Sequence, residues 1–144
     1  MAAGVRSRGR AYALQVLYAL DVDDRADPRE AAAQYATLFE LELDPASVEF
    51  AHALVAETRQ RLSEIDDAVQ SASRNWRLER MSRVDRNILR LATCELRRSD
   101  DVPVKVIINE AVELAKRYGT EDSAAFVNGL LDRIAHNLRR DEGA

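Results

Sequence analysis

Apolar residues recur every three or four positions in each long segment of this chain. The clearest example is residues 104–118, and residues 84–98 and 123–138 show the same spacing. This spacing places the apolar side chains on one face of an α-helix. The 144 residues include only 5 Gly and 3 Pro, so the chain has few of the turn signals that a sheet of many short strands requires. The sequence therefore predicts an all-α fold.

The number of helices and their bounds follow from the same pattern and from local signals. Proline stands directly after Asp at positions 28 and 45, where it suits the first position of a helix. We expect six or seven helices in two small three-helix-type bundles packed together, forming one domain over residues 1–144 with subdomains of roughly 1–75 and 76–144. The expected helices cover residues 8–22, 28–40, 45–62 or on to 72, 84–98, 104–118 and 123–138.

Two connections and one alternative complete the predicted fold. Residues 76–81 interrupt the helical pattern, so we expect a connector with one short turn there. Gly119 is expected to end the preceding helix in the C′ position, and Asp122 and Ser123 are candidate caps of the last helix. The β-branched run 104–108 also fits a short buried strand, although the helical spacing continues unbroken past it.

Composition excludes several classes of protein. Apolar residues make up 47 % of the chain, which is enough to bury a core, so disorder is not expected. No run of about 18 uninterrupted apolar residues occurs, and no signal-peptide stretch follows the N-terminal arginines. Cys94 is the single cysteine, so no internal disulfide can form. We therefore expect a cytoplasmic protein without a membrane span.

Charge is distributed unevenly, although the net charge is only −4. Residues 1–20 hold three Arg and no acidic residue, and residues 74–98 hold eight Arg against three acidic residues. Between them, residues 21–73 hold 13 acidic and 4 basic residues. One reading of the basic segments is solvated helix faces, and the other is a surface for a polyanion.

The N-terminal arginines favour the second reading. Arg6, Arg8 and Arg10 lie before or within the first turn of the predicted first helix. Positive charge at a helix N-terminus opposes the macrodipole and costs roughly 0.3–1 kcal/mol per charge. Because helix stability does not favour this placement, we expect a negative group outside the chain to bind there.

The residues that an enzyme needs are missing from the sequence. His52 and His136 are the only histidines, and neither has a second His or a Cys within one helical turn. Cys94 lies within a predicted helix without a CxxC motif, which is typical of a core cysteine. Glycine-rich phosphate loops, GxSxG and HExxH are all absent. We therefore expect a non-enzymatic protein without a cofactor or a metal ion.

The segment Phe126–Asp132 carries the most informative departure from a regular helix. Gly129 costs about 1 kcal/mol relative to Ala inside a helix. Either another helix packs so closely that only hydrogen fits, or a ligand or partner approaches the backbone, with the amide of Asn128 beside it. Phe126 flanks the apolar stripe, so it is either a core residue or a platform on which an unpaired base stacks.

Two long segments resemble a known family. Residues 84–96 read VDRNILRLATCEL and are followed by DVPVKVIINEAVELAK at 101–116, YGTEDS at 118–123 and FVNGLLD at 126–132. In this order and with these gaps they resemble the C-terminal half of the NusB family of transcription antitermination factors. The Arg-rich stretch leading into ALQVLY at 13–18 resembles the family's first helix. Across residues 24–72 only the helical character matches.

The resemblance implies a function and a set of site residues. It implies RNA binding to boxA-type single-stranded elements of nascent ribosomal RNA transcripts, together with NusE, a ribosomal small-subunit protein, and indirect association with other Nus factors and RNA polymerase. This complex promotes processive transcription, that is, transcription antitermination. The RNA-binding positions that the resemblance implies are Arg6, Arg8, Arg10, Tyr118, Asp122, Phe126 and Asn128, and the positions facing NusE are Tyr18, Asp85 and Arg86.

Several features depart from the family pattern or leave alternatives. Gly9 interrupts a basic run that is often more continuous, Cys94 replaces a common aromatic residue, and Ser73 stands where a tyrosine can lie near the RNA. A helical protein-interaction module is one alternative function. Another is a stand-alone relative of the RNA-binding domain of ribosomal RNA cytosine methyltransferases, whose catalytic α/β domain we do not expect here.

Overall fold

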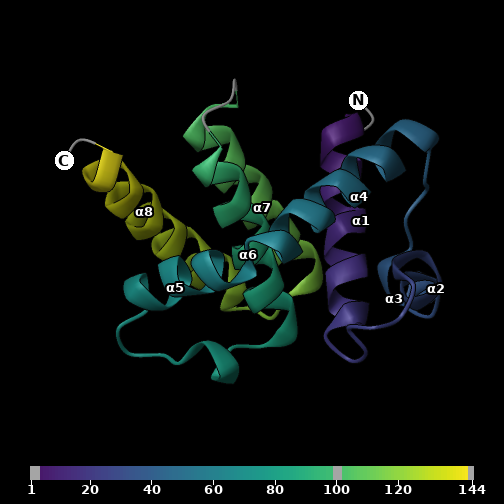
Figure 1. Cartoon of the computed structure of the whole chain (residues 1–144), viewed down its shortest axis with the longest axis horizontal. Helices are drawn as coiled ribbons and strands as arrows, with labels where there is room; N and C mark the ends of the chain where they lie inside the picture. The colour runs from purple at the N-terminus through teal and green to yellow at the C-terminus, as the bar shows by residue number, and fades with distance from the viewer. Residues whose placement is uncertain (1–3, 99–101, 143–144) are drawn as a thin grey trace. The chain divides into compact units, whose positions relative to one another are not determined.

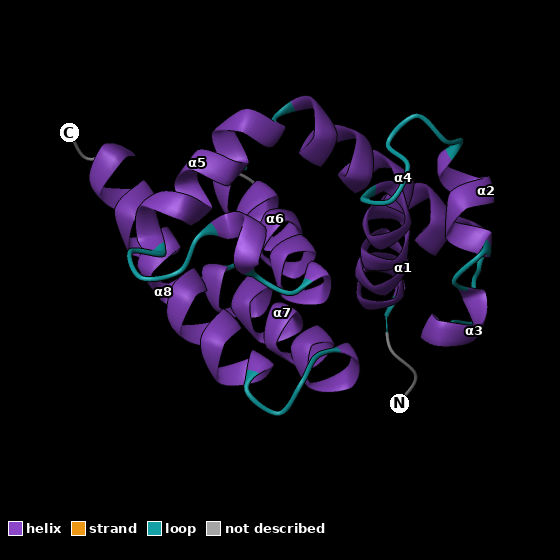
Figure 2. Ribbon diagram, turned by 90° about the horizontal axis from the view of Figure 1, so that it is seen from below, coloured by secondary structure: helices purple, strands orange, loops and turns teal. Residues whose placement is uncertain are grey.

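The computed structural model describes residues 4–98 and 102–142, and every regular element in these ranges is helical (Figures 1 and 2). The predicted all-α fold is confirmed, and the alternative strand at 104–108 is part of a helix. The described elements are α1 (Val5–Leu20), α2 (Pro28–Ala33), α3 (Ala36–Phe39), α4 (Pro45–Gln60), α5 (Leu62–Ala72), the 3₁₀ helix η1 (Leu78–Arg80), α6 (Arg83–Arg97), α7 (Val104–Tyr118) and α8 (Ser123–Glu142).

The chain forms two compact units that divide between Arg59 and Gln60. The boundary expected near residue 75 is therefore earlier, because α5 packs against α6 and α8. A short break at Arg61, with φ −109° and ψ 23°, separates α4 from α5. No proline or glycine marks this break, and for that reason the apolar spacing predicted a helix that could continue across it.

The N-terminal unit places α2 and α3 against α1. One helix was expected over residues 28–40, but the structure breaks it at Gln34 and Tyr35. The carbonyl of Ala32 accepts a hydrogen bond from the backbone N–H of Tyr35 at 2.9 Å and another from the side chain of Gln15 at 2.6 Å. These two donors replace the regular i+4 donor of a continuous helix, so the chain can turn here without leaving this carbonyl unpaired.

Helix α1 also approaches α4 closely, and Gly9 permits that approach. A Cβ atom at Gly9 would lie 2.5 Å from the ring of Phe50 and 3.0 Å from the carbonyl oxygen of Ser47. Ser47 is fully buried, and its hydroxyl donates to the carbonyl of Val5 at 3.1 Å. The glycine that interrupts the basic run is therefore explained by packing.

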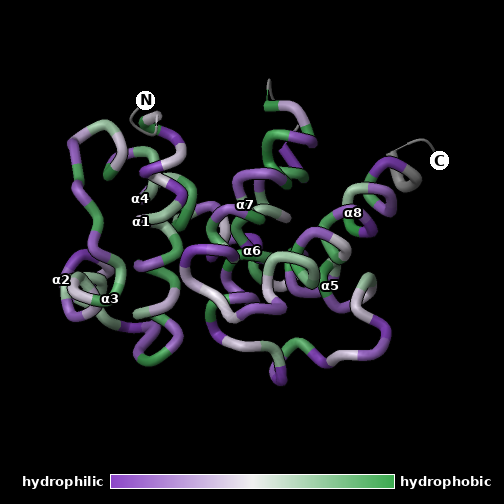
Figure 3. The backbone as a smooth tube through the Cα atoms, turned by 180° about the vertical axis from the view of Figure 1, so that it is seen from behind, coloured by the Kyte–Doolittle hydropathy of each residue, from purple (hydrophilic) through white to green (hydrophobic). Residues whose placement is uncertain are grey.

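The C-terminal unit packs α6, α7 and α8 against one another, with α5 against α6 and α8. Hydrophobic residues recur among hydrophilic ones along α7 and α8 (Figure 3), in keeping with the helical spacing of their apolar residues. Cys94 is buried in α6, which confirms it as a core residue. The fully buried large side chains of this unit include Ile65, Ile88, Leu89, Val127, Leu131 and Ile134.

Helix α7 ends at Gly119, but not in the left-handed conformation that a C′ glycine commonly adopts. Its φ of −91° and ψ of −165° are extended. This position leaves room only for glycine, because a Cβ atom there would clash with the side chain of Ser123 and lie 2.7 Å from the carbonyl oxygen of Ala115. The Ser123 hydroxyl accepts a hydrogen bond from the backbone N–H of Thr120 at 2.9 Å. Ser123 thus holds the turn that leads into α8.

The two helical glycines Gly9 and Gly129 predict opposite responses to the same substitution. No atom of residues 4–98 or 102–142 lies within 4 Å of a Cβ atom at Gly129, whereas Gly9 is packed against Phe50. We expect Gly129→Ala to raise the free energy of unfolding by about 1 kcal/mol, because alanine is the better helix former. We expect Gly9→Ala to lower it by about 1–3 kcal/mol through overpacking. Urea denaturation measures both, and a stabilised Gly9→Ala protein would contradict the packing assignment.

His52 of α4 contacts α1 in a way that disfavours its protonation. Its ring meets Tyr12 edge to face, with ring centroids 5.6 Å apart. Burial lowers the pKa of His52 below its ordinary value of 6.5, and the positive charge of Arg29 lowers it further. The Nε2 atom is buried and has no hydrogen-bond partner among residues 4–98 and 102–142. The neutral imidazole is therefore the form that the fold accommodates.

This lowered pKa predicts a loss of stability in mild acid. Above pH 6.5 the imidazole is neutral in both the folded and the unfolded chain. As the pH falls below 6.5, the unfolded chain takes up the proton first, so stability falls until the pH passes the folded-state pKa. His52→Phe keeps a ring against Tyr12 and removes the titrating group. Between pH 7 and pH 5 its melting temperature should fall less than that of the wild type; equal slopes would contradict the assignment.

Candidate functional site

A pocket of about 450 Å³ opens in the C-terminal unit, where the connector between α5 and α6 meets the start of α8. Three of its residues, Trp76, Met81 and Phe126, are apolar, and two, Asp85 and Asp122, are acidic. The volume is within the range typical of ligand sites. The remaining lining residues are Asn75, Arg80 and Ser82.

The pocket unites some of the predicted site residues and leaves others outside. Asp122 and Phe126, expected at the RNA, lie together with Asp85, which was expected to face NusE. Phe126 is half-buried at the edge of the core. Its burial is thus intermediate between that of a core residue and that of an exposed stacking platform, the two roles that the sequence left open. The other predicted residues of this unit, which do not line the pocket, are Arg86, Tyr118 and Asn128.

Asn128 and Gly129 lie on an exposed part of α8. Residues two positions apart on a helix do not share a face, so Asn128 cannot follow Phe126 into the pocket. None of the described helices packs closely against Gly129, so close helix packing does not explain this glycine. Approach of a ligand or partner to this backbone remains a prediction.

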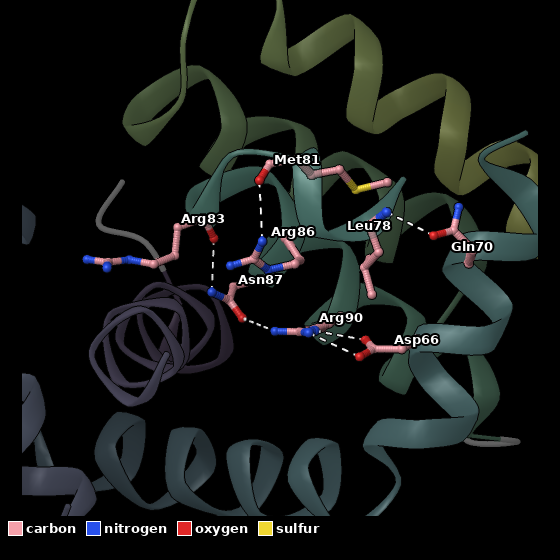
Figure 4. A network of polar contacts seen from close by, with 8 residues as sticks. All are labelled: Asp66, Gln70, Leu78, Met81, Arg83, Arg86, Asn87 and Arg90. Atoms are coloured by element: carbon pink, nitrogen blue, oxygen red, sulfur yellow. Dashed lines mark hydrogen bonds and ion pairs between the residues drawn. The ribbon is translucent and has the colours of Figure 1, made fainter. Parts of the chain in front are cut away.

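The connector that carries Trp76 is fixed to α5 by side-chain hydrogen bonds. Gln70 donates from Nε2 to the carbonyls of Ser73 and Trp76, at 3.1 and 3.2 Å. Its Oε1 accepts from the backbone N–H of Leu78 at 2.8 Å (Figure 4). The Ser73 hydroxyl donates to the carbonyl of Trp76 at 2.6 Å. Ser73, considered above as a replaced RNA-facing residue, is buried and holds the backbone of Trp76 in place.

Helix α6 presents its N-terminus to the pocket. The hydroxyl of Ser82 accepts from the backbone N–H of Asp85 at 3.1 Å, which caps the helix. The Oδ1 atom of Asp85 is buried, and the described part of the chain offers it no hydrogen-bond donor. The guanidinium of the half-buried Arg86 donates to the carbonyl of Met81 at 3.4 Å (Figure 4). Arg86 thus supports the end of the connector.

Sequence reasoning missed Trp76, which is 52 % exposed. Exposed tryptophan is uncommon because its large apolar surface favours burial. The one sequence signal that could have identified Trp76 was its position as an aromatic residue in a segment without helical periodicity. Only the fold brings that segment beside Phe126, which lies 50 positions later in the chain.

In the N-terminal unit, the structure gives Arg8 a partner within the chain. Its guanidinium contacts Asp44 at 2.7 and 2.8 Å. The same carboxylate caps α4 by accepting from the backbone N–H of Ser47 at 2.7 Å. This backbone hydrogen bond, followed by the one from Arg8, lowers the pKa of Asp44. Arg8 therefore has a counter-charge within the chain, and binding of a negative group from outside stays a prediction.

The neighbouring arginines differ in exposure. Arg10 is 5 % exposed, and its guanidinium carbon lies 5.6 Å from the centroid of the Phe50 ring. Arg6 is exposed and lies 6.0 Å from the same ring. Both distances fit cation–π contacts. Of the three arginines predicted to contact RNA, Arg6 is the most accessible and Arg10 is mainly a packing residue.

Tyr18, expected to face NusE, belongs to an aromatic cluster of its own unit. Its ring lies 5.1 Å from Tyr35 and 5.7 Å from Phe39, both edge to face. Phe39 is 1 % exposed, whereas Tyr18 is half-buried. Tyr18 therefore joins α1 to α3 and keeps part of its ring accessible.

The described residues contain no group of three or more His, Cys, Asp or Glu side chains placed to hold a metal ion. None of the described helices is both long and apolar enough to cross a membrane.

Comparison with known proteins identifies the family. The model of the NusB family matches residues 7–136. The chain belongs to the NusB family. It is 50 % identical over 137 residues to a transcription antitermination protein NusB of Sorangium cellulosum, covering 95 % of this chain and 96 % of that relative.

Two solved structures extend the comparison to the fold. A NusB structure from T. maritima is 39 % identical with a TM-score of 0.79, covering 94 % of this chain and 93 % of that one. A crystal structure of the antitermination factors NusB and NusE in complex with dsRNA is 28 % identical with a TM-score of 0.75, covering 92 % and 97 %.

All residues of the pocket lie within the segment that the NusB family model matches, and so do Arg8 and Arg10. Arg6 lies one position before that segment. The role predicted for Arg6 therefore rests on its charge and exposure more than on the family match.

Proposed function

We propose that this NusB-family chain is a transcription antitermination factor that binds boxA-type RNA of nascent ribosomal transcripts together with NusE, without catalysing a reaction. The observation that carries the proposal is the pocket that joins Phe126, Asp122 and Trp76 in a member of this family. An accessible aromatic residue beside polar groups suits an unpaired base. The complex of a related NusB with NusE and dsRNA supports the same pair of partners.

In the proposed complex, the arginines and the pocket make different kinds of contact. Arg6 neutralises phosphates, which adds affinity without sequence preference, whereas the ion pair with Asp44 holds Arg8 back from the same contact. The residues of the pocket contact bases of the RNA. NusE binds at the half-buried Tyr18 and at Arg86, while Asp85 belongs to the pocket. This partner assignment follows the family resemblance.

The decisive experiment measures RNA binding with and without purified NusE. Three RNAs are compared at one salt concentration: a boxA-like single strand, a scrambled single strand and the boxA-like duplex. We expect the boxA-like single strand to bind more tightly than the scrambled strand, and NusE to raise its affinity. NusE binding without RNA binding would overturn the proposal in favour of a protein-interaction module. Tighter duplex binding would overturn the single-strand assignment.

The Arg8–Asp44 ion pair makes a separate prediction about affinity. Asp44→Asn keeps an N-cap side chain for α4 but removes the charge that holds Arg8. Arg8 is then available to a phosphate, so RNA affinity at low salt should rise. The slope of log affinity against log salt should steepen by up to about 0.7, as for one added phosphate contact on a single strand.

Two further variants control this measurement. Arg8→Gln should bind RNA with the same or a shallower salt slope than the wild type, and adding Asp44→Asn to it should not steepen that slope. Thermal melts of each variant verify that the α1–α4 packing persists. If Asp44→Asn steepens the slope even without Arg8, the effect is one of net charge and the release of Arg8 is not its cause.

A further inference from the structure

We propose that the pocket bordered by Trp76 and Phe126 selects one unpaired guanine of the bound RNA. Stacking on the aromatic residues holds the base, and the carboxylates of Asp85 and Asp122 accept hydrogen bonds from its N1–H and 2-amino groups. The proposal rests on the proposed function and adds two things to it: Trp76 as a binding residue, and a base preference with a chemical cause.

Trp76 forms an aromatic wall of the pocket. Its ring is half exposed although the surrounding backbone is held by hydrogen bonds from Gln70 and Ser73. A fixed backbone reduces the conformational entropy that binding must overcome. Trp76 and the half-buried Phe126 line the same space, so a flat base that enters it covers apolar surface of both.

The two carboxylates of the pocket restrict which ligand atoms can lie beside them. Ionised carboxylates only accept hydrogen bonds, and both Asp85 and Asp122 line the pocket. Two carboxylates repel a phosphate, so the ligand atoms that meet them must be donors. Guanine offers two adjacent N–H groups on its Watson–Crick edge. Uracil offers one N–H between two carbonyl oxygens, and the carboxylates repel these oxygens.

A base fits the pocket better than the cationic side chain of a protein partner. Lysine or arginine would also satisfy two carboxylates and an aromatic ring. Arg80, however, lines the same pocket and repels a second cation. The same guanidinium attracts the phosphate attached to a bound nucleotide. A cation from NusE is therefore the competing outcome of the test.

Trp76 is the single tryptophan of the chain, so its fluorescence reports on this pocket alone. The full-length protein is titrated with single strands that differ only in having guanine or uracil at one central position. We expect the guanine strand to quench Trp76 emission and to bind at least about ten-fold more tightly. Labelled RNA is followed by anisotropy in parallel, which measures binding independently of Trp76.

Three variants separate stacking, base recognition and nonspecific effects. Trp76→Leu should weaken binding of the guanine strand about ten-fold. Asp122→Asn exchanges an acceptor for an amide donor, so the preference for guanine over uracil should shrink or reverse. Val106→Ala removes an exposed apolar side chain outside the pocket and serves as the matched control, with unchanged binding. Thermal melts exclude loss of the fold.

Each failure has a different meaning. If the boxA-like strand binds by anisotropy while Trp76 emission and the affinity of Trp76→Leu are unchanged, the base pocket is wrong and the proposed function stands. Equal binding of the guanine and uracil strands overturns the selectivity. If NusE alone quenches Trp76 emission and RNA does not, the pocket binds the protein partner. No RNA binding by any method, with or without NusE, overturns the proposed function itself.

Discussion

The bidentate ion pair between Asp66 and Arg90 sets the geometry on which the candidate site depends. Arg90 donates to both oxygens of Asp66, at 2.8 and 3.0 Å, and joins α6 to α5 (Figure 4). The Arg90 side chain is 13 % exposed and that of Asp66 is 23 % exposed, so water screens the pair only partly. Planar, paired hydrogen bonds fix direction as well as distance. Each such hydrogen bond to a charged group contributes roughly 1.5–3 kcal/mol.

This ion pair also aligns the groups next to it. The amide of Asn87, which is 1 % exposed, accepts from Arg90 at 3.3 Å and donates to the carbonyl of Arg83 at 2.9 Å. One turn along α5 from Asp66, Gln70 holds the connector. The positions of α5 and α6 therefore fix both ends of the loop that carries Trp76. A large apolar ring can remain exposed there because hydrogen bonds of its backbone, and not burial of its side chain, hold the loop.

The sequence predicted the elements of this fold better than their interruptions. Periodic apolar residues gave α7 with the same bounds as the structure and α6 within one residue. The breaks at Arg61 and at Tyr35 were missed, because neither carries a proline or a glycine. The donor from Gln15 to Ala32 joins residues 17 positions apart, and no local pattern reveals it. Gly9 and Gly129 look alike in the sequence, yet only Gly9 is packed.

Local sequence patterns also could not show how the residues of the candidate site come together. Family resemblance supplied Asp85, Asp122 and Phe126, but it divided them between an RNA face and a NusE face, whereas the structure places all three in one pocket. Resemblance likewise treated the three N-terminal arginines as equivalent. Their burial and partners separate them, because the buried Arg10 could reach a phosphate only by leaving Phe50, and Arg8 only by leaving Asp44.

Acidic residues in the proposed RNA pocket also bear on an apparent conflict in the charge pattern. A chain of net charge −4 that binds a polyanion cannot rely on long-range attraction alone. If only a few accessible arginines contact phosphates, the nonspecific affinity for RNA is weak. Discrimination between RNA sequences must then come from contacts with bases. Carboxylates suit that task because they repel phosphates while accepting from base N–H groups. In the proposed complex, the acidic pocket lowers affinity for RNA in general and preserves it for a strand that presents the right base.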